Sequence, residues 1–289
     1  MRISGVFAIK GPTWLINPKT TIEDYVDDFI SDEPGAMRDY AAVPTHSMTP
    51  FFTDGDVLRR KALSGKVCPI SENLIISPEF KPNIAFRYFF AGDLSVAGDD
   101  TGISMVHYDF FKQKVVLDFS MAIHAERGTR VDYGPIRQLI YNLRNRGFNI
   151  KKAVFDQFQS NDSINQLRSN NIDSEQVQYA ESFVGCTQLH ELIHTDKFEY
   201  YDFNEVFIGE AQELQVVNSK RIDHLKTDGF YNSKDVWDSV VNATYVCIQD
   251  YYENGLEAQN NSTVSSVAEK LLLKGGVSQN DFDDISWIL

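Results

Sequence analysis

Three aspartates, Asp93, Asp156 and Asp235, stand where strongly patterned stretches of the chain end or begin, and carboxylates of this kind can bind divalent cations. Asp93 ends the aromatic run 87–92, which predicts a buried strand. Asp156 ends a second apolar run, 152–155, and Asp235 begins a predicted helix. Because clustered carboxylates repel one another unless they are protonated or bound to cations, this order of strand, strand and helix predicts a site for a pair of metal ions.

The helix that follows Asp235 is predicted from apolar residues at helical spacing: Val236, Val240, Ala243 and Cys247. Ser233 is a residue type that caps helices, so we expect it to cap this one. Asp235 and Asp238, three residues apart, share one face of it.

Each of these acids also has a structural explanation. Asp93 can end a strand at a turn, Asp156 can cap the helix that follows it, and Asp235 with Asp238 can complement a helix dipole. Singly, each acid fits the structural explanation well, since aspartate is common in turns and first helical turns. Taken together, however, acids that end consecutive apolar segments of one α/β unit favour a shared site over separate structural roles.

The elements that must position the acids are predicted from the apolar pattern. The runs 103–106 and 115–119 follow the first strand closely, which predicts an antiparallel meander. Helices are expected over 133–146, ended by Gly147, and from 163. A further strand and two further helical stretches are expected over 175–179, 187–194 and 205–216.

Three segments, 92–102, 155–167 and 223–238, carry a resemblance to a known family. In this order they resemble the nuclease domain of the large terminase subunit of tailed bacteriophages, over residues 85 to 250. Upstream, 13–18 and 38–44 resemble the exit from the packaging ATPase domain of that family and the linker beyond it.

The resemblance implies an α/β fold of the ribonuclease H-like type, shared with RuvC and integrases. The expected mixed sheet has its first three strands antiparallel and helices on both faces. It also implies three parts: residues 1–82 as the ATPase exit and linker, 83–252 as the nuclease domain, and 253–289 as a peripheral tail.

The function implied by the resemblance is that of a metal-dependent endonuclease that cuts concatemeric viral double-stranded DNA during packaging. By position, Asp93, Asp156 and Asp235 are the catalytic, metal-binding acids, and Asp100 and Asp238 are further candidate ligands. Two Mg²⁺ or Mn²⁺ ions, about 4 Å apart, would activate a water and stabilise the departing 3′ oxygen. Carboxylate oxygens favour these ions over Zn²⁺.

The net charge of −14 argues against a protein that coats DNA. Positive charge gathers between 124 and 152, and we expect Arg127 and Arg130, after the third strand, to reach towards a duplex. The alternative is that much of this charge is the solvated face of a helix. Lys226 and His224 form a second candidate DNA contact, although His224 also fits an ordinary surface histidine.

The sequence lacks a Gly-x-x-x-x-Gly-Lys-Ser/Thr phosphate-binding loop, so we expect no ATP hydrolysis by this chain itself. Either the chain is a fragment, or its motor half is encoded elsewhere. The implied partners are viral DNA, portal protein, the small terminase subunit and a packaging ATPase domain. No run resembles a membrane span or a signal peptide, and the expected location is the host cytoplasm, transiently at the portal vertex of the procapsid.

Other candidate chemistry is weaker. Cys68, Cys186 and Cys247 form no ligand pattern and are expected to be reduced thiols. His190 and His194 have metal-ligand spacing on a helix, but a third ligand is lacking nearby. Two alternative functions stay open: a Holliday-junction resolvase or transposase of the same acid type, and a non-catalytic packaging or assembly subunit that keeps the fold.

Overall fold

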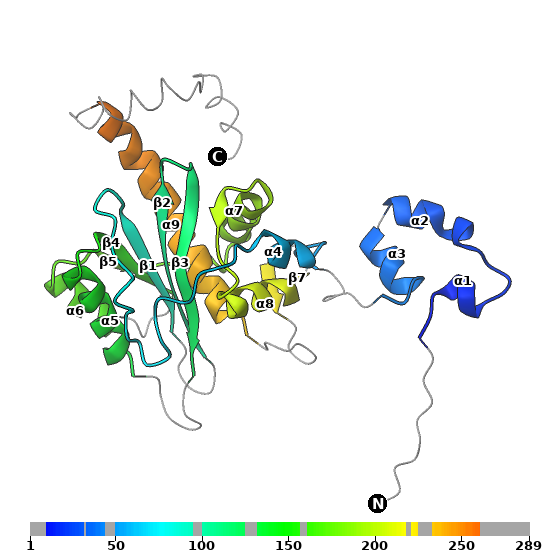
Figure 1. Ribbon diagram of the computed structural model, residues 1–289, viewed down its shortest axis with the longest axis horizontal. Helices are drawn as coiled ribbons and strands as arrows, with labels where there is room; N and C mark the ends of the chain where they lie inside the picture. Colours follow the sequence, from blue (N-terminus) through cyan, green and yellow to red (C-terminus); the bar gives the residue numbers. More distant parts are fainter. Residues whose placement is uncertain are drawn as a thin grey trace, which may run out of the picture.

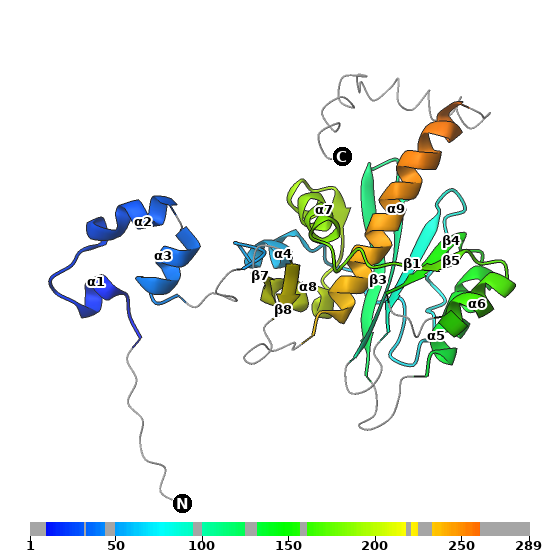
Figure 2. The ribbon, with the colours of Figure 1, turned by 180° about the vertical axis from the view of Figure 1, so that it is seen from behind.

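The computed structural model describes residues 10–31, 33–43, 50–94, 100–124, 132–156, 161–217, 221–224 and 233–260. Its main part is a β-sheet with helices on both faces, and the helices of residues 13–39 stand apart from it in both views (Figures 1 and 2). In the described ranges, no helix combines the length and the apolar character needed to cross a membrane.

Six strands form the main sheet in the order β5-β4-β1-β2-β3-β6. They are β1 (Tyr88–Asp93), β2 (Thr101–Asp109), β3 (Lys114–Ile123), β4 (Ile150–Phe155), β5 (Ser174–Gln176) and β6 (Phe198–Glu199). β1, β2 and β3 are antiparallel neighbours, whereas β4 runs parallel to β1, β5 to β4 and β6 to β3. The predicted mixed sheet with three antiparallel strands first is confirmed.

The central strand β1 is buried on both faces, which explains its continuous apolar sequence. Tyr88 and Phe90 belong to the core on one face, and Phe89 and Ala91 to the core on the other. Because side chains alternate with a period of two, Asp93 falls on the same face as Phe89 and Ala91.

One face of the sheet is covered by α5 (Gly134–Asn145) and α6 (Asn161–Ser169). Four residues of α5 are buried at the predicted helical spacing: Ile136, Leu139, Ile140 and Leu143. The chain leaves this helix through Gly147, whose φ of +96° is a conformation that glycine adopts without strain.

The opposite face is covered by α9 (Asp235–Asn260), which packs across β1, β2 and β3. Beside it lie three shorter helices: α4 (Asp56–Lys61), α7 (Phe183–His194) and α8 (Glu205–Glu213). The four apolar residues used to predict α9 are all buried. Helices on both faces of the sheet are therefore confirmed.

Two regions differ from the sequence predictions. The helix predicted over 205–216 ends sooner, because Leu214–Val217 forms β7, which pairs with β8 (Arg221–His224) in a two-stranded sheet. In the segment 51–82, part of the expected linker, α4 forms and its Leu58 is fully buried in the same core cluster as α9. Neither short element has a run long enough to show a period.

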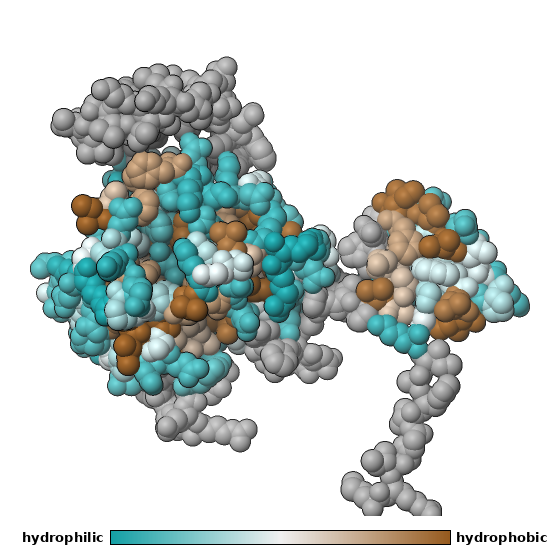
Figure 3. All heavy atoms as spheres, viewed as in Figure 1, coloured by the Kyte–Doolittle hydropathy of each residue, from teal (hydrophilic) through white to brown (hydrophobic). Residues whose placement is uncertain are grey.

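The described residues between 13 and 39 form four short helices: α1 (Thr13–Ile16), η1 (Ile22–Tyr25), α2 (Val26–Ser31) and α3 (Glu33–Asp39). The Trp14 ring contacts Tyr25 and Phe29, with ring centroids 6.2 Å apart in each pair. Leu15 and Ile30 are exposed, and Figure 3 shows apolar patches over this part. The division at residues 82 and 252 stays a prediction.

Candidate active site

Asp93 and Asp156 lie at the carboxyl ends of two adjacent parallel strands. In the β1–β4 register Gly92 pairs with Phe155, so the next residues of the two strands are the two acids. The Asp156 amide donates to the Gly92 carbonyl at 3.4 Å, and the Leu94 amide donates to Asp156 Oδ1 at 3.2 Å. These contacts fix the strand ends so that the two carboxyl groups hydrogen-bond to each other.

The first turn of α9 lies at the same edge of the sheet, against Gly102 of β2. Gly102 pairs with Asp93 in the antiparallel β1–β2 ladder. A Cβ atom at Gly102 would lie 2.0 Å from the Asp235 carbonyl oxygen and 2.5 Å from the Val236 nitrogen. Only glycine allows the strand and the helix start to approach this closely. The charges of Asp235 and Asp238 consequently act on Asp93. The structure thus brings together all three acids of the predicted triad, and Asp238 with them.

The pair formed by Asp93 and Asp156 shares a proton. Burial raises the pKa of Asp93 well above its usual value, and the hydrogen bond and charge of Asp156 raise it further. Burial also raises the pKa of Asp156, while the hydrogen bond from Asp93 opposes that shift. The two carboxyl groups therefore titrate as a coupled pair.

Asp238 is buried and has Lys234 as its partner. The Lys234 ammonium forms an ion pair with Asp238 Oδ2. Burial raises the pKa of Asp238 to about 6, although Lys234 acts in the opposite direction. Burial alone would lower the pKa of Lys234, but the charges of Asp238 and Asp93 keep it above its usual value. The acid cluster therefore contains a counter-charge of its own.

The cluster offers oxygen ligands of the kind that Mg²⁺ and Mn²⁺ prefer. Asp238 Oδ1 is buried and has no hydrogen-bond partner among the described residues, which is unusual for a carboxylate unless a cation uses it. In the side-chain positions seen here, however, no three His, Cys, Asp or Glu residues of the described ranges are arranged to hold a metal ion. The shared proton and the Lys234 ammonium offset part of the negative charge of the acids in these positions. The residue types fit a divalent cation.

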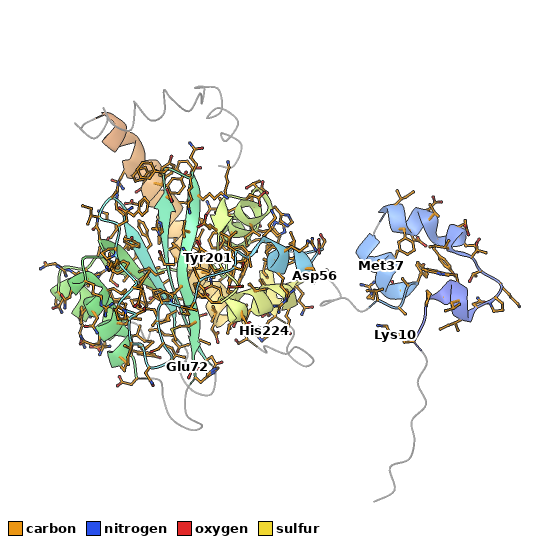
Figure 4. The ribbon with its side chains drawn as sticks, viewed as in Figure 1. Lys10, Met37, Asp56, Glu72, Tyr201 and His224 are labelled. Carbon is orange, nitrogen blue, oxygen red and sulfur yellow. The ribbon has the colours of Figure 1, made fainter. Side chains whose placement is uncertain are left out.

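Of the remaining predicted site residues, two have partners of their own and three fall outside the described residues. Asp100 Oδ1 lies 2.7 Å from His124 Nδ1. His224 ends β8 near α8 (Figure 4), and its Nδ1 lies 3.3 Å from Asp223 Oδ1. The charge of Asp223 acts on Asp238, so β8 borders the acid cluster. Three predicted DNA contacts fall outside the described residues: Arg127, Arg130 and Lys226.

Other candidates from the sequence have structural partners. Arg146 donates to the carbonyl oxygens of Ile76 and Ser77, and Arg137 donates to Ser163 Oγ at 2.8 Å. The helical part of the basic stretch is thus bound to the protein itself. The ring of His190 packs against Phe51 and Phe52, and burial lowers its pKa to about 4. The three cysteines are free thiols.

Sequence reasoning missed one buried acid beside the site, Glu210 of α8. Its Oε2 accepts a hydrogen bond from the Trp237 amide at 2.7 Å, and its Oε1 accepts one from Ser233 Oγ at 2.8 Å. Ser233 was expected to cap α9, but the acceptor of the Trp237 amide in the first turn is Glu210. The sequence does carry a signal for Glu210, because it is an acid inside the otherwise apolar stretch 206–211.

We expect the protein without divalent ions to lose stability as the pH rises. The pKa of each buried acid, Asp93, Asp156, Asp238 and Glu210, is raised by burial, so the folded state binds more protons than the unfolded chain. The free energy of unfolding should therefore fall between about pH 4, where carboxyl groups of the unfolded chain ionise, and the folded pKa values, which are about 6 for Asp238 and about 8 for Glu210. Each unit by which folding raises a pKa lowers the free energy of unfolding by about 1.4 kcal/mol once the pH exceeds the raised value.

Urea denaturation in the presence of EDTA, measured over this pH range, checks the expectation. In the matched variant Asp238→Asn, the part of the decline in the free energy of unfolding that belongs to Asp238, with its pKa of about 6, should be absent. A free energy of unfolding that rises with pH would contradict the assignment of raised pKa values.

The main part of the chain matches the solved structure of the large terminase nuclease from thermophilic phage G20c with bound magnesium, with a TM-score of 0.50. The fold is that of a phage terminase nuclease. The match has 13% sequence identity and covers 69% of this chain and 98% of that chain. A second G20c terminase nuclease structure matches with a TM-score of 0.50, 13% identity, and coverage of 68% and 98%.

The large terminase of bacteriophage HK97 gives a TM-score of 0.46 at 12% identity, over 76% of this chain and 49% of that chain. No protein-family profile matches the sequence, and neither does any curated protein. At these identities the similarity establishes the terminase nuclease fold alone.

Proposed function

We propose that the protein is a metal-dependent endonuclease that cuts concatemeric viral double-stranded DNA during genome packaging. A fold does not specify a reaction, so the proposal depends on the site. The single observation that carries it is that Asp93, Asp156 and Asp235 meet at one edge of a terminase nuclease fold.

In this proposal Asp93, Asp156 and Asp235 hold two Mg²⁺ or Mn²⁺ ions, with Asp238 and Asp100 as further ligands. When bound, the cations supply an activated water and neutralise charge on the departing oxygen. The proton between Asp93 and Asp156 must leave when a cation binds, because a ligating carboxylate is deprotonated. Lys234 keeps the neighbouring Asp238 charged.

The DNA and packaging partners are proposals of the same kind. Arg127, Arg130, Lys226 and His224 are the proposed DNA contacts. The proposed assembly partners are the portal protein, the small terminase subunit and a packaging ATPase domain, with the protein in the host cytoplasm and transiently at the procapsid portal vertex. The terminase nuclease fold supports this context.

Nicking of supercoiled plasmid by the purified chain tests the proposal. We expect nicking with Mn²⁺ or Mg²⁺ and none with EDTA, and the products should carry 5′-phosphate and 3′-hydroxyl ends. A protein that cuts with neither cation would instead be the non-catalytic packaging subunit. Preferential cutting of a four-way junction over a linear duplex would favour the resolvase alternative.

The variant Asp156→Asn should lower the nicking rate by at least about 10²-fold, because the amide keeps the shape of the side chain but not the charge that a cation requires. Its melting temperature without divalent ions should be unchanged or higher, since one crowded charge is removed and the Asn oxygen can still accept from Leu94. Differential scanning fluorimetry checks this second part. A large drop in melting temperature would show that Asp156 has a structural role.

A further inference from the structure

We propose that Glu210 is a positioning residue of this site, which fixes the first turn of α9 and thereby places Asp235 and Asp238 beside Asp93. The inference rests on the proposed function, because it concerns acids that are proposed to bind cations. Glu210 itself lies on α8, which is next to the start of α9 in both ribbon views (Figures 1 and 2).

The contacts of Glu210 both go to the start of α9. The residue is 1% exposed, and its two carboxyl oxygens accept hydrogen bonds from Ser233 Oγ and from the Trp237 amide. Asp235 lies between these two donors in the sequence. Glu210 therefore holds the chain on both sides of a proposed ligand.

A helix start leaves its first backbone amides without partners inside the helix. The usual cap is a side chain from the residue just before the helix. Here the acceptor of the Trp237 amide comes from another helix, 27 residues earlier in the chain. This cap therefore satisfies the amide and also ties α9 to α8.

A second contact between the two helices supports the same geometry. The Phe207 ring of α8 stacks on the Trp237 ring, with centroids 5.7 Å apart and planes 7° apart. On its other side the α9 start touches Gly102 of β2. The first turn is thus held between α8 and the sheet, and a displacement of about 1 Å in such a place can cost about 10² in rate.

The choice of a carboxylic acid at this position has an electrostatic cost. Burial raises the pKa of Glu210 to about 8, its two hydrogen bonds oppose the shift, and the charges of Asp235 and Asp238 add to it. Apolar packing would avoid this cost. What an apolar residue lacks is an acceptor for the amide and the hydroxyl at the start of α9.

The test compares variants by the Mn²⁺ concentration at the midpoint of a binding titration of the folded protein, measured by isothermal titration calorimetry without DNA. Glu210→Ala removes both hydrogen bonds, and we expect its midpoint to rise about 10- to 100-fold. Glu210→Gln keeps an acceptor for Trp237 and a polar group for Ser233, so its midpoint should stay within about threefold of the wild type.

Gln212→Ala is the matched control. Gln212 is a buried residue of the same helix, and its side chain donates to the Gly55 carbonyl at 2.9 Å, away from α9. We expect this variant to melt at a lower temperature with the wild-type Mn²⁺ midpoint. If Glu210→Ala does not fold, Glu210→Asp replaces it, with an expected rise of about tenfold in the midpoint, because the carboxylate is withdrawn by one methylene.

The outcomes separate this inference from the proposed function. If Glu210→Ala or Glu210→Asp melts earlier but keeps the wild-type midpoint, Glu210 is only structural and the inference is wrong, while the nuclease proposal stands. If Mn²⁺ does not bind the wild type at all, the metal site of the proposed function is wrong, and the inference falls with it.

Discussion

Replacing Asp93 with alanine should reduce Mn²⁺-dependent plasmid nicking by at least about 10³-fold, the order of loss when a group that acts on the reacting charge is removed. Asp93 is the acid that the others surround: it hydrogen-bonds with Asp156 and feels the charges of Asp235 and Asp238. Its removal takes away the proposed ligand that lies between the strand end of Asp156 and the helix start of Asp235. The rate of loss of supercoiled plasmid, at equal protein concentration, measures the effect.

Asp109 supplies a matched control for Asp93. It is also a buried aspartate, but it lies at the opposite end of β2, where Oδ1 accepts from the amides of Phe111 and Lys112 in the β2–β3 turn. Asp109→Ala should lower the melting temperature and keep the nicking rate. Equal nicking by the wild type and Asp93→Ala would remove the basis for the acid cluster as the active site.

The melting temperature of Asp93→Ala distinguishes loss of function from loss of folding. A group whose folded pKa lies above its unfolded pKa is destabilising once the pH exceeds the folded value. Burial and the neighbouring acids raise the pKa of Asp93 in this way, so its removal relieves repulsion. The variant should melt at or above the wild-type temperature in EDTA, and it should gain less than the wild type from added Mn²⁺.

The second large effect is expected from Gly102→Ala, although it adds only one carbon atom. That carbon would lie 2.0 Å from the Asp235 carbonyl oxygen, far inside van der Waals contact, and the obstacle is backbone. The start of α9 must therefore move away from β2, which carries Asp235 away from Asp93. We expect about a 10²-fold lower nicking rate and a loss of about 1–3 kcal/mol in the free energy of unfolding.

Ser104→Ala is the control for this change. Ser104 lies two residues further along β2, so it shares the face of Gly102, and its Oγ is buried without a hydrogen-bond partner in the described part of the chain. Removing that hydroxyl should leave nicking unchanged and stability equal or higher. Wild-type nicking by Gly102→Ala would mean that the exact place of the α9 start does not matter for the reaction.

Asp93 and Asp156 show which parts of the site are predictable from the sequence. Each follows an apolar run that is too short and too β-prone for a helix, so their places at strand ends follow from local pattern. The period of two puts Asp93 on a definite face once the strand is known, and Asp235 marks a helix start. The antiparallel order of the first three strands and α9 were accessible for this reason, whereas the fold class followed from the resemblance to terminase nucleases.

Glu210, Lys234 and Gly102 show what was not accessible. Their roles depend on contacts between elements that are distant in the sequence, as between Glu210 and Trp237, or on how closely a strand approaches a helix. Neither the contacts between distant elements nor the closeness of the strand to the helix leaves a pattern in the local sequence. The short strands β6 and β7 were missed for a related reason, since pairing partners and not their own few residues define them.

The shared proton and the Lys234 ammonium have a consequence for long-range attraction. Bare carboxylates at one edge would repel any polyanion approaching a chain whose net charge is already −14. Because Asp93 and Asp156 share a proton and Lys234 pairs with Asp238, that edge carries less negative charge than its composition indicates. If the edge binds DNA as proposed, a phosphate backbone would meet a weaker repulsion there before divalent cations bind.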